Sequence, residues 1–339
     1  MSDDRRVAGN TASRVAWAKV NLTLAVTGRR ADGYHELASV FLRVGLSDRL
    51  ALDAVAATEM APGDRLVVDD DPDCPIEGNL VLRAAAAVRA ELARRAGTWS
   101  PGPRGSGAGS AAPALRFRLR KRIPIGAGLA GGSSDAAAAL EMSATALGLE
   151  LAPAERSRLA ARLGADAPFF VGGHAAALVT GIGEQLEPLP APRSDPCLLL
   201  VTPAVRLATR DVFAAYDALP RRPSSAATLT AELAASLHRG LEAAQLAALA
   251  TELRDANDLW PAAVAVAPGL AALRAALETT LGRPFLLTGS GSTLVGLYAS
   301  VADAVAAGSA AVSAGLPASA DARLVAVDIT HPDPIWRFP

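Results

Sequence analysis

The sequence predicts an α+β protein of two domains. Strand-like and helix-like segments follow one another without strict β-α-β alternation, which favours α+β over a doubly wound parallel sheet. A length of 339 residues indicates two domains, at about 150 residues each. The pattern of segments starts again near Pro190. We therefore expect a first domain over residues 1–189, a second over residues 190–330 and a proline-punctuated tail over residues 331–339.

Segments of the first domain follow from periodicity and from residues that begin or end elements. Residues 115–122 alternate apolar and basic side chains, which predicts a half-exposed antiparallel strand that Pro124 ends. Asn79 is a suitable N-cap for a helix, and Pro153 suits the first turn of another. A loop rich in glycine, serine and proline is expected over residues 97–113. We expect strands over residues 14–27, 35–52 (as one or two) and 175–180, and helices over residues 79–96, 134–147 and 152–163.

The second domain reads as a mixture of short strands and helices. Apolar runs bounded by turn residues predict its strands, and longer segments rich in alanine and leucine predict its helices. We expect strands over residues 198–201, 284–287, 293–298 and 323–327, and helices over residues 209–219, 229–253, 270–278 and 302–314.

Composition excludes several classes of protein. A net charge of −1 argues against a nucleic-acid or anionic-membrane surface. The two cysteines, Cys74 and Cys197, form no C-x-x-C, which indicates neither a zinc site nor a disulfide framework. The polar N-terminus has no apolar core of a signal peptide, and prolines, a glycine and an arginine interrupt the most apolar stretch, residues 259–277. We expect a cytoplasmic monomer or weak homodimer with no nucleic-acid or membrane partner.

A glycine-rich loop that leads into a helix is the most informative segment. Four glycines in the seven residues 126–132 remove side chains where the backbone must approach a ligand closely. Two serines follow where the helix begins, and a helix N-terminus attracts phosphate. The predicted phosphate loop consists of Pro124, Ile125, Gly126, Ala127, Gly128, Leu129, Ala130, Gly131, Gly132, Ser133 and Ser134.

Other interpretations of this loop are open. Residues 126–131 satisfy G-x-G-x-x-G, but a buried apolar strand does not precede them, so the dinucleotide fingerprint is weak. The Walker pattern fails because Gly132 stands where lysine is required. A flexible linker would also be rich in glycine.

The chain has 33 basic residues, of which only Lys19 and Lys121 are lysines. Lys121 lies in an Arg-Lys-Arg run, and we expect it on a solvated strand face. Lys19 lies among apolar residues, which suggests a need for a compact ammonium group, although a strand lysine can also extend its head into water.

Asp166 is the carboxylate that best suits a partnership with Lys19. It follows Gly164 and precedes Ala167, Pro168 and two phenylalanines, and a carboxylate in such a setting needs a partner or a function. A turn or capping aspartate is the alternative. As a pair, Asp166 would accept a hydroxyl proton and Lys19 would stabilise the alkoxide.

Two further segments could contact a substrate. Thr288-Gly289-Ser290-Gly291-Ser292 can press its backbone and hydroxyls onto a phosphate, or can simply close a hairpin. Tyr34 and His35 offer a stacking ring and an imidazole for a flat heterocycle, although a single histidine is often structural. The histidines form no H-x-x-x-H pair, and no transition-metal site is expected.

Together these motifs resemble the GHMP kinase superfamily and, within it, the 4-diphosphocytidyl-2-C-methyl-D-erythritol kinases. The superfamily pattern P-x-G-x-G-L-x-G-G-S-S matches residues 124–134. Trp17 departs from the family, which has proline before A-K. Motifs of the narrower family match at A-K-V-N-L (residues 18–22), R-x-D-G-Y-H (30–35), N-L-V-x-R-A (79–84), L-G-A-D-x-P-x-F (163–170), G-H-A-A (173–176), G-x-G-E (181–184) and T-G-S-G-S (288–292).

The resemblance implies a fold and an activity. The fold would be the two-domain GHMP kinase fold, with an N-terminal domain like domain 2 of ribosomal protein S5 and a ferredoxin-like C-terminal domain. The activity would be ATP-dependent phosphorylation of the 2-hydroxyl of the cytidine-diphosphate-linked methylerythritol, on the non-mevalonate route to isoprenoid precursors. ATP would bring Mg²⁺, for which no protein ligands are assigned.

The resemblance also implies roles for single residues. Lys19 and Asp166 would be catalytic, and the glycine loop would bind ATP. Asn21 would lie beside the reacting hydroxyl, Tyr34 and His35 would bind cytosine, and Gly289 and Ser290 would contact substrate. Competing hypotheses are another GHMP kinase or decarboxylase, a nucleotide sensor without activity, and a dinucleotide oxidoreductase.

Overall fold

The computed structural model describes residues 12–55, 63–69, 71, 73–98, 113–220, 223–316, 322–331 and 336–337. The chain divides into two compact units. The first comprises the described residues of Met1–Ala16, Asp48–Arg122 and Gly132–Gly172, and the second comprises those of Trp17–Ser47, Ile123–Gly131 and Gly173–Pro339. The units alternate along the chain because strands β1 (Ala12–Asn21) and β3 (His35–Val55) continue from one unit into the other. The predicted domain boundary at residues 189 and 190 stays a prediction.

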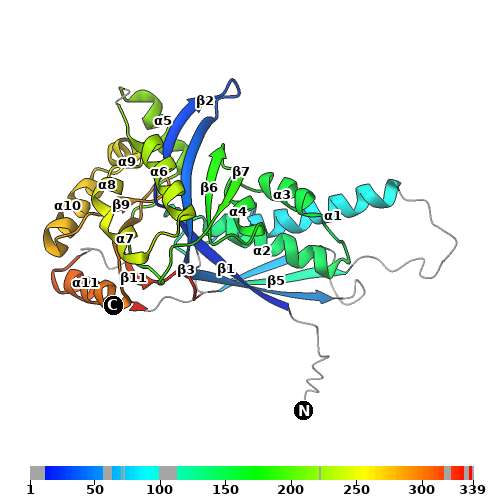
Figure 1. Ribbon diagram of the computed structural model, residues 1–339. Coiled ribbons are helices and arrows are strands. Elements are labelled where there is room, and N and C mark those ends of the chain that lie inside the picture. Colours follow the sequence, from blue (N-terminus) through cyan, green and yellow to red (C-terminus); the bar gives the residue numbers. More distant parts are fainter. Residues whose placement is uncertain are drawn as a thin grey trace, which may run out of the picture. The chain divides into compact units, whose positions relative to one another are not determined.

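Helices cover one side of the strands in the first unit (Figure 1). Strand β5 (Ala114–Arg120) pairs antiparallel with residues 49–55 of β3 and parallel with β4 (Arg65–Asp69). The arginines of β5 are exposed and the apolar side chains between them are buried, which confirms the predicted half-exposed strand. The helices are α1 (Leu80–Thr98), α2 (Gly131–Ala146), α3 (Pro153–Ala161) and α4 (Ala167–Val171).

Helix starts follow the predicted chemistry. The backbone N–H of Val81 donates to Asn79 Oδ1 at 3.0 Å, so Asn79 caps α1 as expected. Pro153 occupies the first turn of α3, and Glu155 accepts the backbone N–H of Ala152 at 2.9 Å. Small side chains on α2, from Ala136 to Ala139, are buried and let the helix approach its neighbours closely.

Glu91 of α1 is the acceptor of an arginine cluster. Its side chain is only 4% exposed and accepts hydrogen bonds from Arg94 Nη2 at 2.5 Å, Arg95 Nε at 3.2 Å and Arg158 Nη2 at 3.4 Å. The hydrogen bond from Arg94 is the main cause that lowers the pKa of Glu91 to about 2. Glu91 thus links α1 to α3.

We predict that Glu91 contributes to stability in a pH-dependent way. Its folded pKa lies below its ordinary value of 4.5, so the contribution is complete above pH 4.5 and is lost as pH falls toward 2. Glu91→Gln should lower the free energy of unfolding at pH 7. As the pH falls toward 2, the free energy of unfolding should decrease less in this variant than in the wild type, as measured by urea denaturation at several pH values. Glu150→Gln, at an exposed position of the same unit, is the control. An equal decrease of the free energy of unfolding in acid for Glu91→Gln and the wild type would contradict this prediction.

The second unit contains two sets of strands. Strand β2 (Ala25–Arg29) and strand β6 (Ala176–Gly181) both pair antiparallel with β3, and β7 (Gln185–Leu189) pairs with β6. A separate five-stranded sheet has the order β12-β11-β8-β10-β9. Its strands are β8 (Cys197–Thr202), β9 (Leu286–Leu287), β10 (Leu294–Tyr298), β11 (Arg323–Val327) and β12 (Trp336–Arg337).

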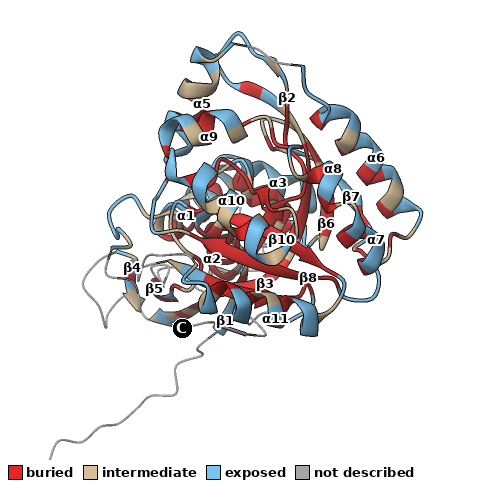
Figure 2. Cartoon of the chain, turned by 90° about the vertical axis from the view of Figure 1, so that its left-hand side faces the viewer, coloured by how far each residue is buried: buried red, intermediate tan, exposed pale blue. Residues whose placement is uncertain are grey.

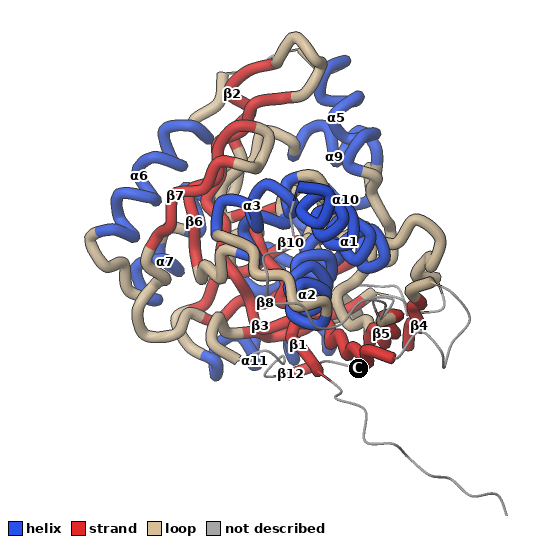
Figure 3. Tube along the Cα trace, turned by 90° about the vertical axis from the view of Figure 1, so that its right-hand side faces the viewer, coloured by secondary structure: helices blue, strands red, loops and turns tan. Residues whose placement is uncertain are grey.

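Helices of the second unit flank these strands (Figure 3). Strands β8 and β10 are buried along their whole length, whereas the helices expose their outer faces (Figure 2). The helices are α5 (Thr209–Ala218), α6 (Ala226–His238), α7 (Ala243–Ala248), α8 (Ala250–Leu253), α9 (Trp260–Val266), α10 (Gly269–Leu281) and α11 (Val301–Ser313).

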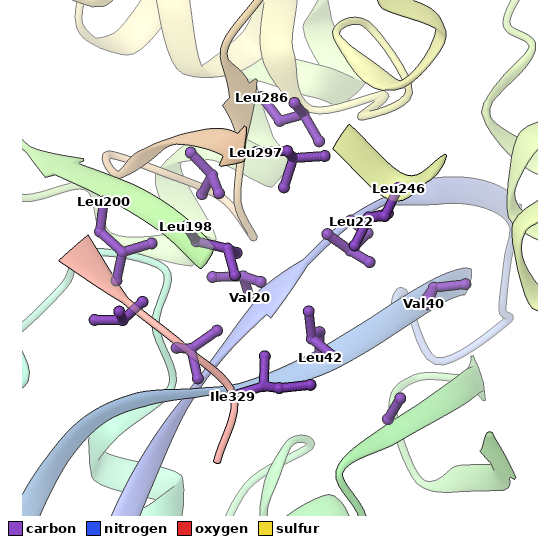
Figure 4. Packing of buried hydrophobic residues seen from close by; sticks show 14 of the residues in the cluster. Val20, Leu22, Val40, Leu42, Leu198, Leu200, Leu246, Leu286, Leu297 and Ile329 are labelled. Carbon is purple, nitrogen blue, oxygen red and sulfur yellow. The ribbon is translucent and has the colours of Figure 1, made fainter. Parts of the chain in front are cut away.

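Strand β8 divides the interior of the second unit into two cores. Leu198 and Leu200 enter one core, and Cys197, Leu199 and Val201 enter the other, as the alternation of a strand requires. Figure 4 shows the first core, where β1 and β3 bring their apolar side chains to β8, β9, β10 and α7. Its labelled members are Val20, Leu22, Val40, Leu42, Leu198, Leu200, Leu246, Leu286, Leu297 and Ile329.

Several predicted elements differ from the structure. The single helix over residues 229–253 is wrong: α6 ends before Gly240, whose φ of +90° is left-handed, and Glu242 then caps α7. The strand over residues 14–27 is interrupted between β1 and β2, where Leu24 forms a bridge with Asn257. Strands β4 and β7 and helix α9 were not expected.

Two predicted segments lie largely outside the described residues. The loop over residues 97–113 is one of them. In the tail over residues 331–339, Trp336 and Arg337 form β12 on the edge of β11.

No single helix in the described part of the chain is long and apolar enough to cross a bilayer. Helices α9 and α10 reach the length and composition only together, and they are bent by 118° at their junction.

Candidate active site

Lys19 lies near the end of β1 and is buried in the second unit, with 4% of its surface exposed. Its ammonium Nζ donates to Asn21 Oδ1 at 2.6 Å and lies 4.3 Å from the centroid of the Phe41 ring. The amide oxygen and the ring face both favour a positive charge. The head of Lys19 is therefore held among buried partners, and the alternative of a lysine extended into water is wrong.

Asn21 connects this lysine to the second glycine cluster. Its backbone N–H donates to Thr288 Oγ1 at 2.7 Å, and its Nδ2 donates to Ser39 Oγ at 2.8 Å. Both Asn21 and Thr288 are buried, so these hydrogen bonds fix the amide oxygen toward Lys19. The contact between Thr288 and Asn21 could not be predicted from local sequence, because the two residues are 267 positions apart.

The glycine loop packs directly onto the second glycine cluster. The backbone N–H of Lys19 donates to Leu129 O at 3.2 Å, and that of Thr293 donates to Ala127 O at 3.2 Å. Gly128 has a φ of +79°, and a Cβ there would lie 2.4 Å from Thr288 O and 3.0 Å from Gly291 O. Only glycine permits this approach of backbone to backbone. The loop is therefore built into the unit, which contradicts a flexible linker.

Residues 288–293 also close the hairpin between β9 and β10. The backbone N–H of Thr288 donates to Thr293 O at 3.2 Å, and that of Gly291 donates to Thr288 O at 3.0 Å. Asn257 Nδ2 holds the turn through Leu287 O at 2.9 Å and Gly289 O at 3.0 Å. The hairpin interpretation is thus confirmed, and the same turn faces the glycine loop. Asn257 was missed by sequence reasoning because its partners are 30 and 32 residues away.

Gly289 and Ser290 occupy the tip of this turn. A Cβ on Gly289 would lie 3.0 Å from Gly128 O and 3.5 Å from Asn21 Oδ1. Ser290 Oγ is 3.1 Å from Thr209 Oγ1 at the start of α5. The turn, the loop and the Lys19–Asn21 pair therefore form one contiguous group within the second unit.

The first unit holds the start of α2 and the candidate carboxylate. Ser133 and Ser134 lie in the first turn of α2, and a Cβ on Gly164 would approach Ser133 Oγ to 3.0 Å. Gly164 leads to Asp166, whose backbone precedes α4. Asp166 occupies the N-cap position of α4, in a turn, but its side chain makes no capping hydrogen bond to that helix. A side-chain cap is therefore wrong, and the turn alternative stays open. The start of α2 and the turn that carries Asp166 are thus neighbours.

Lys121 is buried, which contradicts the predicted solvated strand face. We expected it on a solvated strand face, but it is 5% exposed. Its Nζ donates to Asp48 Oδ2 at 2.5 Å and to Asp135 Oδ2 at 2.9 Å. Lys121 continues the alternation of β5, in which Leu115, Phe117 and Leu119 are buried, and so faces inward. There it meets Asp48, 73 residues away in the sequence, and Asp135, 14 residues away.

His35 and Tyr34 have different environments. Tyr34 is 62% exposed. The His35 ring is buried, stacks on Phe213 with centroids 4.9 Å apart and planes 20° apart, and meets the edge of Tyr216. Its Nε2 is 2.8 Å from Asp217 Oδ1. A stacked aromatic group with one ring nitrogen already bonded leaves the other nitrogen for a ligand.

The described residues contain no group of three or more histidine, cysteine, aspartate or glutamate side chains that could hold a metal ion.

Similarity to known proteins identifies the family. A family model of the GHMP kinase N-terminal domain matches residues 79–174. A 4-diphosphocytidyl-2-C-methyl-D-erythritol kinase of Sinorhizobium medicae is 35% identical over 300 residues, which cover 86% of this chain and 88% of the relative. The chain belongs to the 4-diphosphocytidyl-2-C-methyl-D-erythritol kinase family of the GHMP kinases. The resemblance seen in the motifs is thereby confirmed.

Solved structures agree with this family fold. A crystal structure of 4-(cytidine 5'-diphospho)-2C-methyl-D-erythritol kinase matches with a TM-score of 0.63 at 32% identity, covering 94% of this chain and 99% of that one. A homoserine kinase of Cytophaga hutchinsonii matches with a TM-score of 0.64 at 17% identity, covering 98% and 99%, which shows the fold alone. The predicted α+β GHMP kinase fold is confirmed.

Proposed function

We propose that this GHMP kinase transfers a phosphoryl group from ATP to the 2-hydroxyl of 4-diphosphocytidyl-2-C-methyl-D-erythritol, in the non-mevalonate route to isoprenoid precursors. The relatives of near-full length bear that substrate in their names. The observation that carries the proposal is the group formed by the glycine loop, the turn over residues 288–293 and the Lys19–Asn21 pair. It combines an anion-binding backbone with a buried, oriented ammonium.

The roles of the two catalytic candidates follow from their chemistry. Asp166 accepts the proton of the acceptor hydroxyl as the oxygen attacks the terminal phosphorus atom of ATP, whose bond to the bridging oxygen breaks so that ADP leaves. Lys19 stabilises the negative charge that develops on that oxygen, and Asn21 keeps the ammonium in place. A positioned base of this kind contributes about 10²–10⁴-fold in rate. The rest of the acceleration in phosphoryl transfer comes from alignment and charge stabilisation.

The glycine loop and the serines at the start of α2 bind the phosphates of ATP. Residues 125–134 supply backbone N–H groups, and the start of α2 supplies the positive end of a helix dipole and two serine hydroxyls. Mg²⁺ that arrives with the nucleotide would supply charge neutralisation at the phosphates held by this loop. Because Gly132 replaces the lysine of a Walker loop, this loop holds phosphate without a cation of its own.

Tyr34 and His35 recognise the cytosine of the substrate. Asp217 engages Nε2 of His35 and Phe213 supports the ring, so the imidazole presents a fixed edge. The Tyr34 ring is exposed and can stack on a base. Gly289 and Ser290 contact the substrate from the second turn.

We predict strict dependence on the cytidine group. In a coupled ADP-release assay, the wild type should turn over the diphosphocytidyl substrate, and not mevalonate, homoserine or methylerythritol phosphate. His35→Ala should raise KM for the diphosphocytidyl substrate about ten-fold or more, the equivalent of one lost buried hydrogen bond, and leave KM for ATP unchanged. His238→Ala, at an exposed histidine, is the control. Turnover of mevalonate or homoserine in place of the cytidine substrate would overturn the proposed function.

A cytoplasmic location and a monomeric or weakly dimeric state stay predictions.

A further inference from the structure

A buried trio of charged side chains includes the residues that flank the glycine loop in the sequence, and it has no part in the chemistry above. Lys121 donates to both Asp48 and Asp135, and the backbone N–H of Arg122 donates to Asp48 Oδ1 at 2.5 Å. The side chains of Lys121, Asp48 and Asp135 are 3%, 0% and 4% exposed. All of these residues belong to the first unit.

The trio joins the two flanks of the loop. Lys121 and Arg122 precede Ile123 and the loop, which begins at Pro124. Asp135 directly follows Ser133 and Ser134 in the first turn of α2, where the loop ends. Asp48 lies in β3 and binds both Lys121 and the backbone of Arg122. The hydrogen bonds of Lys121 therefore connect the segment before the loop to the segment after it. Asp48 connects both to strand β3.

Such a cluster costs free energy that a purely structural core would avoid. Burial raises the pKa of Asp135 to about 7, with Lys121 opposing and Asp48 adding to the rise. Burial alone would lower the pKa of Lys121, but Asp135 and Asp48 together raise it. Apolar residues of similar size often replace buried ion pairs with no loss of stability. Retaining one of the chain's two lysines here indicates a need for fixed geometry.

We propose that Lys121, Asp48 and Asp135 are positioning residues that hold the glycine loop and the serine-bearing start of α2 in the geometry that binds the ATP phosphates. This inference rests on the proposed assignment of the loop to ATP. None of the three touches the reacting atoms. Lys121 acts by joining the flanks of the loop, and Asp48 acts by fixing Lys121 and Arg122.

The test separates positioning from a general role in folding. Lys121→Met removes the charge and keeps the length of the side chain. We expect KM for ATP to rise ten-fold or more while KM for the diphosphocytidyl substrate stays within two-fold. Lys121→Arg keeps a cation and several donors, so it should recover most of the ATP affinity. Arg118→Met, at an exposed position of β5, should leave both KM values unchanged.

A second variant covers the case in which Lys121→Met does not fold. Asp135→Asn keeps the size of the side chain and an oxygen that can accept from Lys121, so we expect a folded enzyme with a KM for ATP raised by three-fold or more. An unchanged KM for ATP in folded Lys121→Met or in Asp135→Asn, even with a lower amount of active enzyme, would show that the trio is only structural and would overturn the proposal.

A loop variant distinguishes failure of this inference from failure of the loop assignment. Gly128→Ala alters the loop itself and leaves the trio intact. If Gly128→Ala raises KM for ATP and Lys121→Met does not, the positioning role is wrong and the loop assignment stands. If Gly128→Ala leaves KM for ATP unchanged, the loop does not bind ATP, and the positioning role fails with it.

Discussion

Replacing Lys19 by methionine, or Asp166 by asparagine, is expected to lower kcat by about 10²–10⁴-fold, the range that positioned acid–base groups contribute. ATP binding should persist in both variants, because the phosphates are held by the glycine loop. Methionine is preferred to alanine at position 19 because it fills most of the buried volume and limits the collapse of Phe41 and Asn21 around a cavity. Initial rates with both substrates saturating, together with calorimetric binding of ATP, measure the two effects.

The effects of the two substitutions on kcat should not be additive. If Asp166 removes the proton while Lys19 stabilises the same oxygen, either loss disables one joint step, and the double variant should be little worse than the poorer single variant. Asp211→Asn, which neutralises an exposed carboxylate, should keep full activity. A kcat above one tenth of the wild-type value in Lys19→Met or Asp166→Asn would show that the residue is not catalytic.

Local chemistry could be predicted from the sequence where neighbours along the chain decide it. The alternation of apolar and basic side chains over residues 115–120 predicts a strand with one buried and one solvent-exposed face, and β5 has both. Asn79 caps α1 because its side chain reaches a backbone N–H two residues ahead. The glycine loop was recognisable because the close approach of backbone selects glycine at several positions in one short segment.

Contacts between distant segments could not be predicted in this way. Lys121 lies in a basic run typical of a solvated face, and its burial is tolerable only because it pairs with Asp48, 73 residues away, and with Asp135, 14 residues away. Thr288 binds the backbone of Asn21 across 267 residues. The site lysine could be singled out by its apolar neighbours, but the groups that orient it come from other parts of the fold.

The helix expected over residues 229–253 shows how one residue can override propensity. Alanine and leucine run through the whole segment and favour a continuous helix. Gly240 adopts a left-handed φ and ends α6, and the capping box of Glu242 and Gln245 then begins α7. A glycine followed two residues later by a capping side chain is a stronger signal than the composition around it.

Gly128→Ala should lower kcat/KM for ATP more than any other glycine-to-alanine substitution in the loop. The new Cβ would lie 2.4 Å from the carbonyl oxygen of Thr288, and a φ of +79° is strained for alanine by about 1 kcal/mol. Thr288 is backbone-bonded within its hairpin and also holds Asn21, so the loop must move instead. A displacement of about 1 Å can cost 10²-fold in rate, and we expect kcat/KM for ATP to fall by at least that factor.

Gly282→Ala is the matched control because it separates backbone strain from contact. Gly282 ends α10 with a φ of +61°, and an added Cβ there meets nothing within 4 Å. Both variants should lose about 1 kcal/mol in the free energy of unfolding through strain, and only Gly128→Ala should lose activity. Equal kinetics for the two variants would mean that the approach of the loop to the turn over residues 288–293 is dispensable. A loss confined to Gly128→Ala would tie the ATP site to the one contact that the methyl group blocks.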